Sequence, residues 1–246
     1  MFDAPSPIKH LTEFKRLLKN YNPNLELLDL ITKDPFVLLA APTAAGRNTI
    51  VKNLIMTGRY YYVISDTTRH PRINNGVPEK NGNEYWFKSE EEFLRDLRKN
   101  NYIEAAIIHN QQVSGINVQE LRHASQTGAI PITDVDIQGC DTIMSVIDKA
   151  IPIFILPPDF PEWMSRLDGR GAMERSEKIR RLTSATNEIE LALERSYFKF
   201  MVNYDLRLTI ETLHEHIISG QFGELEQSNA RMHAQKLLTD LDKYLH

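Results

Sequence analysis

The most constraining feature of this sequence is a regular alternation of short apolar runs with longer helical patterns, from Pro35 to about Ile218. Strand-like runs occupy residues 36–40, 60–65, 130–135, 151–156 and 198–203. Helical patterns separate the last three runs, and this is the spacing that a crossover between parallel strands requires. The sequence therefore predicts an α/β domain built on a largely parallel sheet of five strands.

Composition and charge narrow the class of protein. The chain has 246 residues, 41% of them hydrophobic, and its 29 Lys and Arg against 33 Asp and Glu give a net charge of −4. Such a chain is globular over most of its length and has no overall basic field that would hold nucleic acid. The single cysteine cannot close an intrachain disulfide, and no apolar run approaches the ~20 residues of a membrane span. We therefore expect a cytoplasmic protein with no nucleic-acid or membrane partner.

The loop after the first predicted strand is a candidate phosphate-binding loop. It reads Ala-Pro-Thr-Ala-Ala-Gly-Arg-Asn-Thr over residues 41–49, before a helix that we expect to begin near Asn48 and to end at Gly58. In a P-loop, backbone N–H groups surround the phosphates, a lysine neutralises their oxygens and a hydroxyl helps to hold Mg²⁺. Here Arg47 replaces the lysine and Asn48 replaces the hydroxyl residue. Taken alone, these nine residues favour an ordinary strand-to-helix turn.

Two further helix starts carry capping signals. Ser89 precedes Glu92 by three residues, and Asn117 precedes Glu120 by the same spacing, so each pair predicts a capped N-terminus. Gly128 is expected to end the second of these helices. The surrounding segment, from residue 66 to 114, is richer in short strands, turns and charges, and we place a small inserted lobe there.

A series of motifs resembles the guanylate kinase family. Residues 65–72, Ser-Asp-Thr-Thr-Arg-His-Pro-Arg, are similar to the family's Ser-x-Thr-Thr-Arg-x-Pro-Arg stretch, and residues 84–87, Glu-Tyr-Trp-Phe, are similar to its Tyr-x-Phe stretch. Other matches follow in order at 102–104, 134–139, 154–158, 166–171, 181–182 and 202–206. The resemblance implies a P-loop NTPase-like three-layer α/β/α fold with a central parallel five-stranded sheet. It also implies a small mixed acceptor-binding lobe at about 66–116 and a helical lid at about 159–182, within a domain of residues 35–218.

The resemblance assigns residues to the acceptor nucleotide. Arg69, Arg72 and Tyr85 correspond to the family's clamp on the acceptor phosphate, a task that suits the planar donors of arginine and a phenolic hydroxyl. Glu104 and Asp136 correspond to the carboxylates that accept hydrogen bonds from guanine, and Ser65 corresponds to another residue of that pocket.

The resemblance also assigns residues to ATP and to the transferred phosphoryl group. The implied catalytic residues are four arginines that share transition-state charge, Arg47, Arg166, Arg170 and Arg181. The implied ATP-binding residues are Ala44, Ala45, Gly46, Arg47, Asn48, Thr49, Arg166 and Asn203. Asp134 would hold Mg²⁺ through a water molecule, and Asn48 offers a neutral oxygen as a second ligand.

The implied reaction transfers the γ-phosphoryl group of ATP to GMP or dGMP, with Mg²⁺, and gives ADP and GDP or dGDP. The alternative is a catalytically inactive guanylate-kinase-like pseudokinase or scaffold that binds a nucleotide or a phosphorylated peptide at the acceptor site. The altered P-loop favours the alternative, whereas the lid arginines favour the enzyme.

Departures from the family pattern concern both binding sites. Val113 stands where the family has a phosphate-contacting tyrosine, and Gly115 where it has a base-contacting hydroxyl, unless a register shift brings Ser114 into that place. Glycine is scarce, at 11 residues, and Ala41, Ala44 and Ser114 stand at aligned glycine positions. Since alanine does not readily adopt φ > 0, we expect the phosphate loop of this chain to bind ATP differently from the usual glycine-rich loop.

Helical segments flank this domain on both sides. Residues 1–34 carry apolar residues at helical spacing (Leu11, Phe14, Leu17 and Leu18, then Leu25, Leu27, Leu28 and Leu30), and residues 219–246 repeat the pattern with Met232, Leu237, Leu238, Leu241 and Leu245. These extensions either cover the edge of the core or form a homodimer or partner contact. His214 and His216 are two residues apart and point away from each other on a helix, so we expect no metal site there.

Overall fold

The computed structural model describes residues 7–24, 35–74, 76–108, 110–169, 171 and 173–246. The chain divides into two compact units. Unit 1 comprises Met1–Asp34, Tyr61–Pro131 and Asp141–Lys149, and unit 2 comprises Pro35–Tyr60, Ile132–Cys140 and Ala150–His246. The predicted leucines at 25, 27, 28 and 30 lie outside the described residues.

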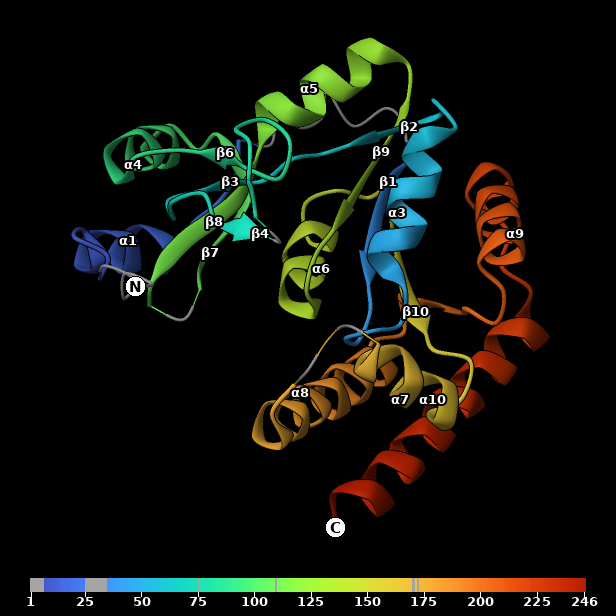
Figure 1. Ribbon diagram of the computed structural model, residues 1–246. Helices are drawn as coiled ribbons and strands as arrows, with labels where there is room; N and C mark the ends of the chain where they lie inside the picture. The colour runs from blue at the N-terminus through green and yellow to red at the C-terminus, as the bar shows by residue number, and fades with distance from the viewer. Residues whose placement is uncertain (1–6, 25–34, 75, 109, 170, 172) are drawn as a thin grey trace. The chain divides into compact units, whose positions relative to one another are not determined.

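A five-stranded sheet has the strand order β11-β10-β1-β9-β2. Strand β1 pairs in parallel with both β9 and β10, and β10 pairs in parallel with β11 (Figure 1). Every residue of β1 is buried, as expected for a central strand covered on both faces. The strands are β1 (Phe36–Ala40), β2 (Tyr60–Tyr62), β9 (Ile130–Asp134), β10 (Ala150–Leu156) and β11 (Lys199–Val202).

All five predicted strands are present, and β2 differs most from its predicted bounds. It ends at Tyr62 rather than at Ser65. Beyond it, the backbone N–H of Ile64 donates to the Glu120 carboxylate at 3.2 Å, so a side chain takes the donor that a longer strand would have used.

Helices of unit 2 pack against one another and against the sheet edge. The helix α3 contacts α9, while α10 contacts α7, α8 and strand β11. Their bounds are α3 (Arg47–Met56), α7 (Phe160–Asp168), α8 (Arg175–Glu194), α9 (Leu206–Ser219) and α10 (Glu224–Leu245), and α6 (Ile137–Met144) crosses the boundary between the units. Gly58 follows the end of α3 with φ 71°, as its predicted terminating role requires.

Unit 1 contains a small mixed sheet of order β6-β3-β8-β7. Strand β3 is parallel to β6 and antiparallel to β8, which forms a hairpin with β7. The elements of this unit are α1 (Leu11–Leu18), β3 (Asp66–Thr67), β4 (Ile73–Asn74), β5 (Val77–Pro78), β6 (Trp86–Phe87), α4 (Glu90–Arg98), β7 (Tyr102–Ile108), β8 (Gln112–Asn117) and α5 (Val118–Thr127).

The capping predictions are confirmed at Ser89 and only in part at Asn117. Ser89 and Glu92 form a reciprocal capping box at the start of α4. Asn117 caps α5 by accepting from the backbone of Gln119, but Glu120 does not complete a box. Its buried carboxylate instead accepts hydrogen bonds from the Trp86 indole and from the Tyr61 hydroxyl.

Both terminal helices cover core surface within their own units. In unit 1, Phe14 of α1 is fully buried and packs edge-on against Phe93 of α4. In unit 2, Leu237 and Leu241 of α10 are buried, whereas Met232 is exposed and does not belong to the packed face. Among the helices that the structure describes, none combines the length and apolar character needed to span a bilayer.

The helix α10 also closes the open edge of the five-stranded sheet. The Gln227 side chain accepts from the N–H of Phe200 at 2.7 Å and donates to its C=O at 3.1 Å. One amide side chain thus supplies the two hydrogen bonds that a further strand would make to Phe200 of β11.

We predict that Gln227→Ala lowers the free energy of unfolding by about 1–3 kcal/mol, because it leaves the half-buried backbone groups of Phe200 without partners. Urea denaturation measures this change. The matched control is Gln235→Ala, at an exposed position of the same helix. Equal losses in the two variants would contradict an edge-closing role for Gln227.

Candidate active site

The predicted phosphate-binding loop lies between β1 and α3 and contains two residues with positive φ. Ala44 has φ 62° and Gly46, the N-cap residue of α3, has φ 98°. The Ala45 N–H donates to the Pro42 C=O at 3.2 Å, which closes a turn inside the loop. The alanine at a glycine position has therefore not prevented the left-handed turn, and the N-terminus of α3 begins directly after it.

Arg47, at the position of the P-loop lysine, is paired with both candidate metal ligands. One of its terminal nitrogens lies 2.7 Å from Asp134 Oδ2, and its Nε lies 3.4 Å from Asn48 Oδ1. The Arg47 and Asp134 side chains are each about one quarter exposed, at 26% and 27%. The structure thus places three predicted donor-site residues together, whereas Thr49 points outward at the first turn of α3 as an exposed residue.

Asn203 and Arg166 lie against the same loop. Asn203 follows β11, is 3% exposed, and donates from Nδ2 to the C=O of Ala45 at 2.9 Å. Both terminal nitrogens of Arg166 lie 3.4 Å from the Asn203 C=O, while its Nε donates to Glu162 at 2.9 Å. Asn203 Oδ1 is buried and has no hydrogen-bond partner among the described residues, which leaves an acceptor beside the loop.

Of the other two predicted catalytic arginines, Arg181 and Arg170, the structure describes only Arg181. Arg181 lies on α8, where its Nε donates to Glu177 one turn earlier at 2.7 Å. Arg170 is outside the described residues, so its predicted role rests on the sequence.

Glu188 of α8 is a titratable residue of this region that the sequence analysis did not identify. Burial raises its pKa to about 7, against the opposing effect of the Arg47 charge, and the negative charge of Asp136 adds to the rise. Its only sequence signal is an acid on the half-buried side of a long helix. The donor region therefore contains a carboxyl group that ionises near neutral pH.

The predicted acceptor clamp of unit 1 is held by a carboxylate. Both terminal nitrogens of Arg69 donate to Glu79, at 2.5 and 2.9 Å, and the Arg69 guanidinium lies over the rings of Tyr85 and Phe87. Glu79 also accepts from the backbone N–H of Arg72, whose side chain is exposed. The pairing fixes the plane of the Arg69 guanidinium next to Tyr85, as bidentate recognition of a phosphate requires.

Sequence analysis missed Glu79, because an isolated acid in a turn-rich segment resembles an ordinary surface residue. Ser65, the first residue of the motif, contributes its backbone C=O to the sheet of unit 1 by accepting from Trp86 at 3.0 Å.

Strand pairing decides the register that the sequence left open between Ser114 and Gly115. Thr67 pairs with Ser114, and Ser114 pairs with Ala106, so these residues share a face of the sheet with Glu104, two residues before Ala106. The Ser114 hydroxyl donates to Thr67 Oγ1 at 3.0 Å. Gly115 faces the opposite side, where a Cβ would overlap Glu104 O and Ala105.

Val113 is fully buried in the core of unit 1, on the face opposite to Ser114 and Gln112. The pairing therefore places Ser114, rather than Gly115, on the face of Glu104, and it places Val113 on the opposite face. Ser114 and Gln112, joined by a hydrogen bond of 3.4 Å, lie on the face that carries Glu104.

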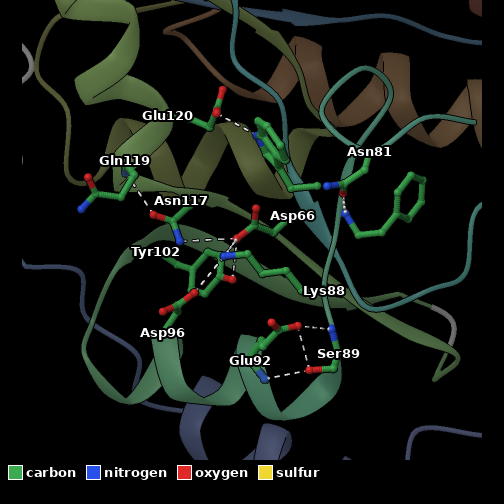
Figure 2. A network of polar contacts seen from close by, with 12 residues as sticks. Asp66, Asn81, Lys88, Ser89, Glu92, Asp96, Tyr102, Asn117, Gln119 and Glu120 are labelled. Carbon is green, nitrogen blue, oxygen red and sulfur yellow. Dashed lines mark hydrogen bonds and ion pairs between the residues drawn. The ribbon is translucent and has the colours of Figure 1, made fainter.

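A network of buried polar groups supports β3 from that opposite face (Figure 2). Asp66 is 1% exposed and accepts from the Tyr102 hydroxyl at 2.7 Å, and Lys88 Nζ lies 2.6 Å from Asp66 and 2.8 Å from Asp96. Burial raises the pKa of Asp66, with Lys88 opposing the rise. Burial alone would lower the pKa of Lys88, but its hydrogen bonds to the two aspartates outweigh it and raise that pKa. Because Lys88 contacts both Asp66 of β3 and Asp96 of α4, it links the strand that precedes Arg69 to that helix.

Asp136, a predicted guanine-binding residue, caps α6. Its Oδ1 accepts from the N–H of Gly139 at 2.7 Å, which orients the carboxylate. Asp136 belongs to unit 2, whereas Glu104 lies on β7 of unit 1.

Comparison with known proteins decides the family. The family model described as Guanylate kinase matches residues 33–220. The chain belongs to the guanylate kinase family. Curated guanylate kinases are similar over most of their length: that of Sulfurimonas denitrificans is 32% identical over 72% of this chain and 84% of its own, and that of Rickettsia prowazekii is 32% identical over 76% and 92%.

A solved structure supports the fold. A crystal structure of guanylate kinase from Anaplasma phagocytophilum matches with a TM-score of 0.56 and 24% identity, covering 78% of this chain and 88% of that one. The predicted P-loop NTPase-like α/β fold is therefore confirmed. As a guanylate kinase family member, the chain is a nucleoside monophosphate kinase, and the inactive-scaffold alternative is not favoured.

We predict that Glu79→Gln raises the KM for GMP about tenfold with a smaller change in kcat, because it weakens the charge-assisted pair that orients Arg69. Steady-state kinetics with GMP varied measures the effect. Glu91→Gln, an exposed acid of the same unit that pairs with His10, is the matched control. An unchanged or lower KM in Glu79→Gln would show that Glu79 does not position the clamp.

Glu188 predicts a pH dependence of stability. In the unfolded chain its carboxyl ionises near 4.5, and in the folded protein its pKa is raised to about 7. The folded state therefore binds more protons between these values, so this residue makes stability fall as pH rises from about 4.5 to 7.

Glu188→Gln should remove this part of the slope. Urea denaturation at several pH values measures it, with Glu190→Gln, an exposed residue of the same helix, as the control. Parallel stability curves for Glu188→Gln and the wild type would contradict the raised pKa.

Proposed function

We propose that this guanylate kinase transfers the γ-phosphoryl group of ATP to GMP or dGMP with Mg²⁺, using the residues assigned above. The observation that carries the proposal is the phosphate loop, which keeps its left-handed turn and its arginine next to Asp134 although its sequence is unusual. Phosphoryl transfer depends mainly on positioning and electrostatic stabilisation, and this loop supplies both.

On the donor side, backbone N–H groups at the start of α3 bind the ATP phosphates, aided by the positive end of the helix dipole. Arg47 supplies the positive charge that a lysine would supply, with a planar head that can contact two phosphate oxygens. Its ion pair with Asp134 holds the Arg47 guanidinium at the end of β9 before ATP binds. Arg166, Arg170 and Arg181 neutralise charge on the transferred group.

The donor region fits a Mg²⁺ ion that arrives with the nucleotide. Mg²⁺ prefers one or two carboxylate ligands together with water and phosphate oxygens. The Asp134 carboxylate and the Asn48 amide oxygen are hard oxygen donors, and both already neighbour Arg47. When bound, the ion would neutralise negative charge on the ATP phosphates.

On the acceptor side, Arg69, Arg72 and Tyr85 bind the GMP phosphate. Glu104 and Asp136 accept from the guanine N1–H and amino groups, which adenine does not offer together on that edge. Ser114, on the face of Glu104, supplies the hydroxyl of this pocket, and Ser65 completes the set.

We place this activity in purine nucleotide metabolism in the cytoplasm, with no nucleic-acid or membrane partner. The terminal helices also carry exposed apolar side chains, such as Met232 and Tyr244 of α10. These side chains support a homodimer contact through those helices.

The test is a turnover assay with ATP, Mg²⁺ and a panel of nucleoside monophosphates. We expect diphosphate from GMP and dGMP only, and a loss of about a hundredfold in kcat for Arg181→Ala. Arg180→Ala, a more exposed neighbour that contacts the same Glu177, is the matched control. If GMP yields no GDP above the Arg181→Ala level, the proposal fails.

A further inference from the structure

Ala44 has an unusual backbone conformation for its residue type. Among the described residues, Ala44, Asn100 and Asn110 are the non-glycine residues with positive φ. Asparagine tolerates this region because its side chain hydrogen-bonds locally, but alanine has only the Cβ that disfavours it. Groups outside the loop must therefore compensate for the missing glycine.

Two side chains bind the carbonyl groups on either side of Ala44. The indole Nε1 of Trp163 donates to the C=O of Thr43 at 2.7 Å, and Nδ2 of Asn203 donates to the C=O of Ala45 at 2.9 Å. Trp163 is fully buried and Asn203 is 3% exposed. Both donor side chains are thus shielded from water, where the loss of a partner is most costly.

Both donors are themselves fixed to the protein body. Trp163 lies in the first turn of α7, where its backbone N–H donates to Asp159, the N-cap residue. The backbone N–H of Asn203 donates to Leu156, at the end of β10, at 2.8 Å. The Asn203 amide also packs so closely on the loop that a Cβ at Gly46 would overlap it.

The two contacts determine where the loop directs its N–H groups. Across a trans peptide bond, a C=O and the following N–H point in opposite directions. Holding the Thr43 carbonyl toward Trp163 therefore turns the Ala44 N–H the other way, and holding the Ala45 carbonyl toward Asn203 does the same for Gly46. These are amides of the loop that surrounds the phosphates.

We propose that Trp163 and Asn203 are positioning residues that hold the phosphate loop in its left-handed turn and so permit an alanine at position 44. The inference rests on the proposed function for its link to ATP, since the loop would then bind the donor phosphates. In a loop with glycine at this position, the turn would need no such support.

A double-mutant cycle between positions 163 and 44 tests the proposal. Trp163→Phe keeps an aromatic ring and removes the donor, so it should raise the KM for ATP about tenfold, as expected for one buried hydrogen bond. Adding Ala44→Gly to this variant should reverse most of the rise in KM, because glycine adopts the turn unaided. The same rise in both backgrounds, or no rise, would overturn the role of Trp163.

Trp86→Phe is the matched control. It removes the same indole donor, which in unit 1 binds Glu120. Its effect on the KM for ATP should be the same with alanine and with glycine at position 44. If Trp86→Phe coupled to Ala44→Gly as strongly as Trp163→Phe does, the cycle would report general destabilisation, and the proposal would be overturned.

Asn203→Ala tests the second contact, the hydrogen bond to the Ala45 carbonyl. Its KM is measured for ATP and for inosine triphosphate, which lacks the adenine amino group. A positioning role predicts an equal rise in KM for both nucleotides, reduced by Ala44→Gly. A rise confined to ATP would assign Asn203 to the adenine base and remove it from the proposal.

Hydrogen exchange separates this inference from the proposed function. The Ala45 amide, which donates to the Pro42 C=O inside the loop, should exchange faster in Trp163→Phe than in the wild type, and Ala44→Gly should reduce that difference. This readout needs no turnover, so it decides the proposal even if the chain makes no GDP. Unchanged exchange in Trp163→Phe would overturn the proposal while leaving the proposed function intact.

Discussion

The site of unit 2 depends on the pairing of the buried strand β1 with its parallel neighbour β9. In that register Leu39 lies beside Asp134, so the end of β9 delivers its carboxylate next to the loop that begins two residues after Leu39. Parallel strands bring their carboxyl ends to one edge, and ligands of open α/β sheets bind there. The ion pair between Arg47 and Asp134 is a direct result of this register.

A second regularity is that each described arginine with a predicted phosphate role, apart from the exposed Arg72, already has a carboxylate partner. Arg47 pairs with Asp134, Arg69 with Glu79, Arg166 with Glu162 and Arg181 with Glu177. These pairs reduce the number of conformations that each long side chain samples. Each pair thus fixes where the guanidinium lies before a nucleotide binds.

The sequence predicted the architecture well because strand and helix periodicity depend on local chemistry. It located the five strands, the Ser89 cap and the phosphate loop, and it grouped Arg47 with Asp134 through the family resemblance. It could not find Glu79 or Glu120, since their roles depend on partners distant in the chain, Arg69 and Trp86. It also could not decide between Ser114 and Gly115, because a shift of one residue in a hairpin reverses both faces and only the actual pairing fixes it.

The packing of α1 within unit 1 shows which residues belong to the same core as the family domain. Phe14 packs on Phe93, Phe93 stacks on Tyr102, and the Tyr21 hydroxyl bridges the backbone of Tyr102. None of Phe14, α1 or Tyr21 falls within residues 33–220, which the family shares. The packed aromatic core of unit 1 therefore extends beyond the homologous segment, and a fragment that begins at residue 33 would expose the faces of Phe93 and Tyr102 that Phe14 and Tyr21 cover.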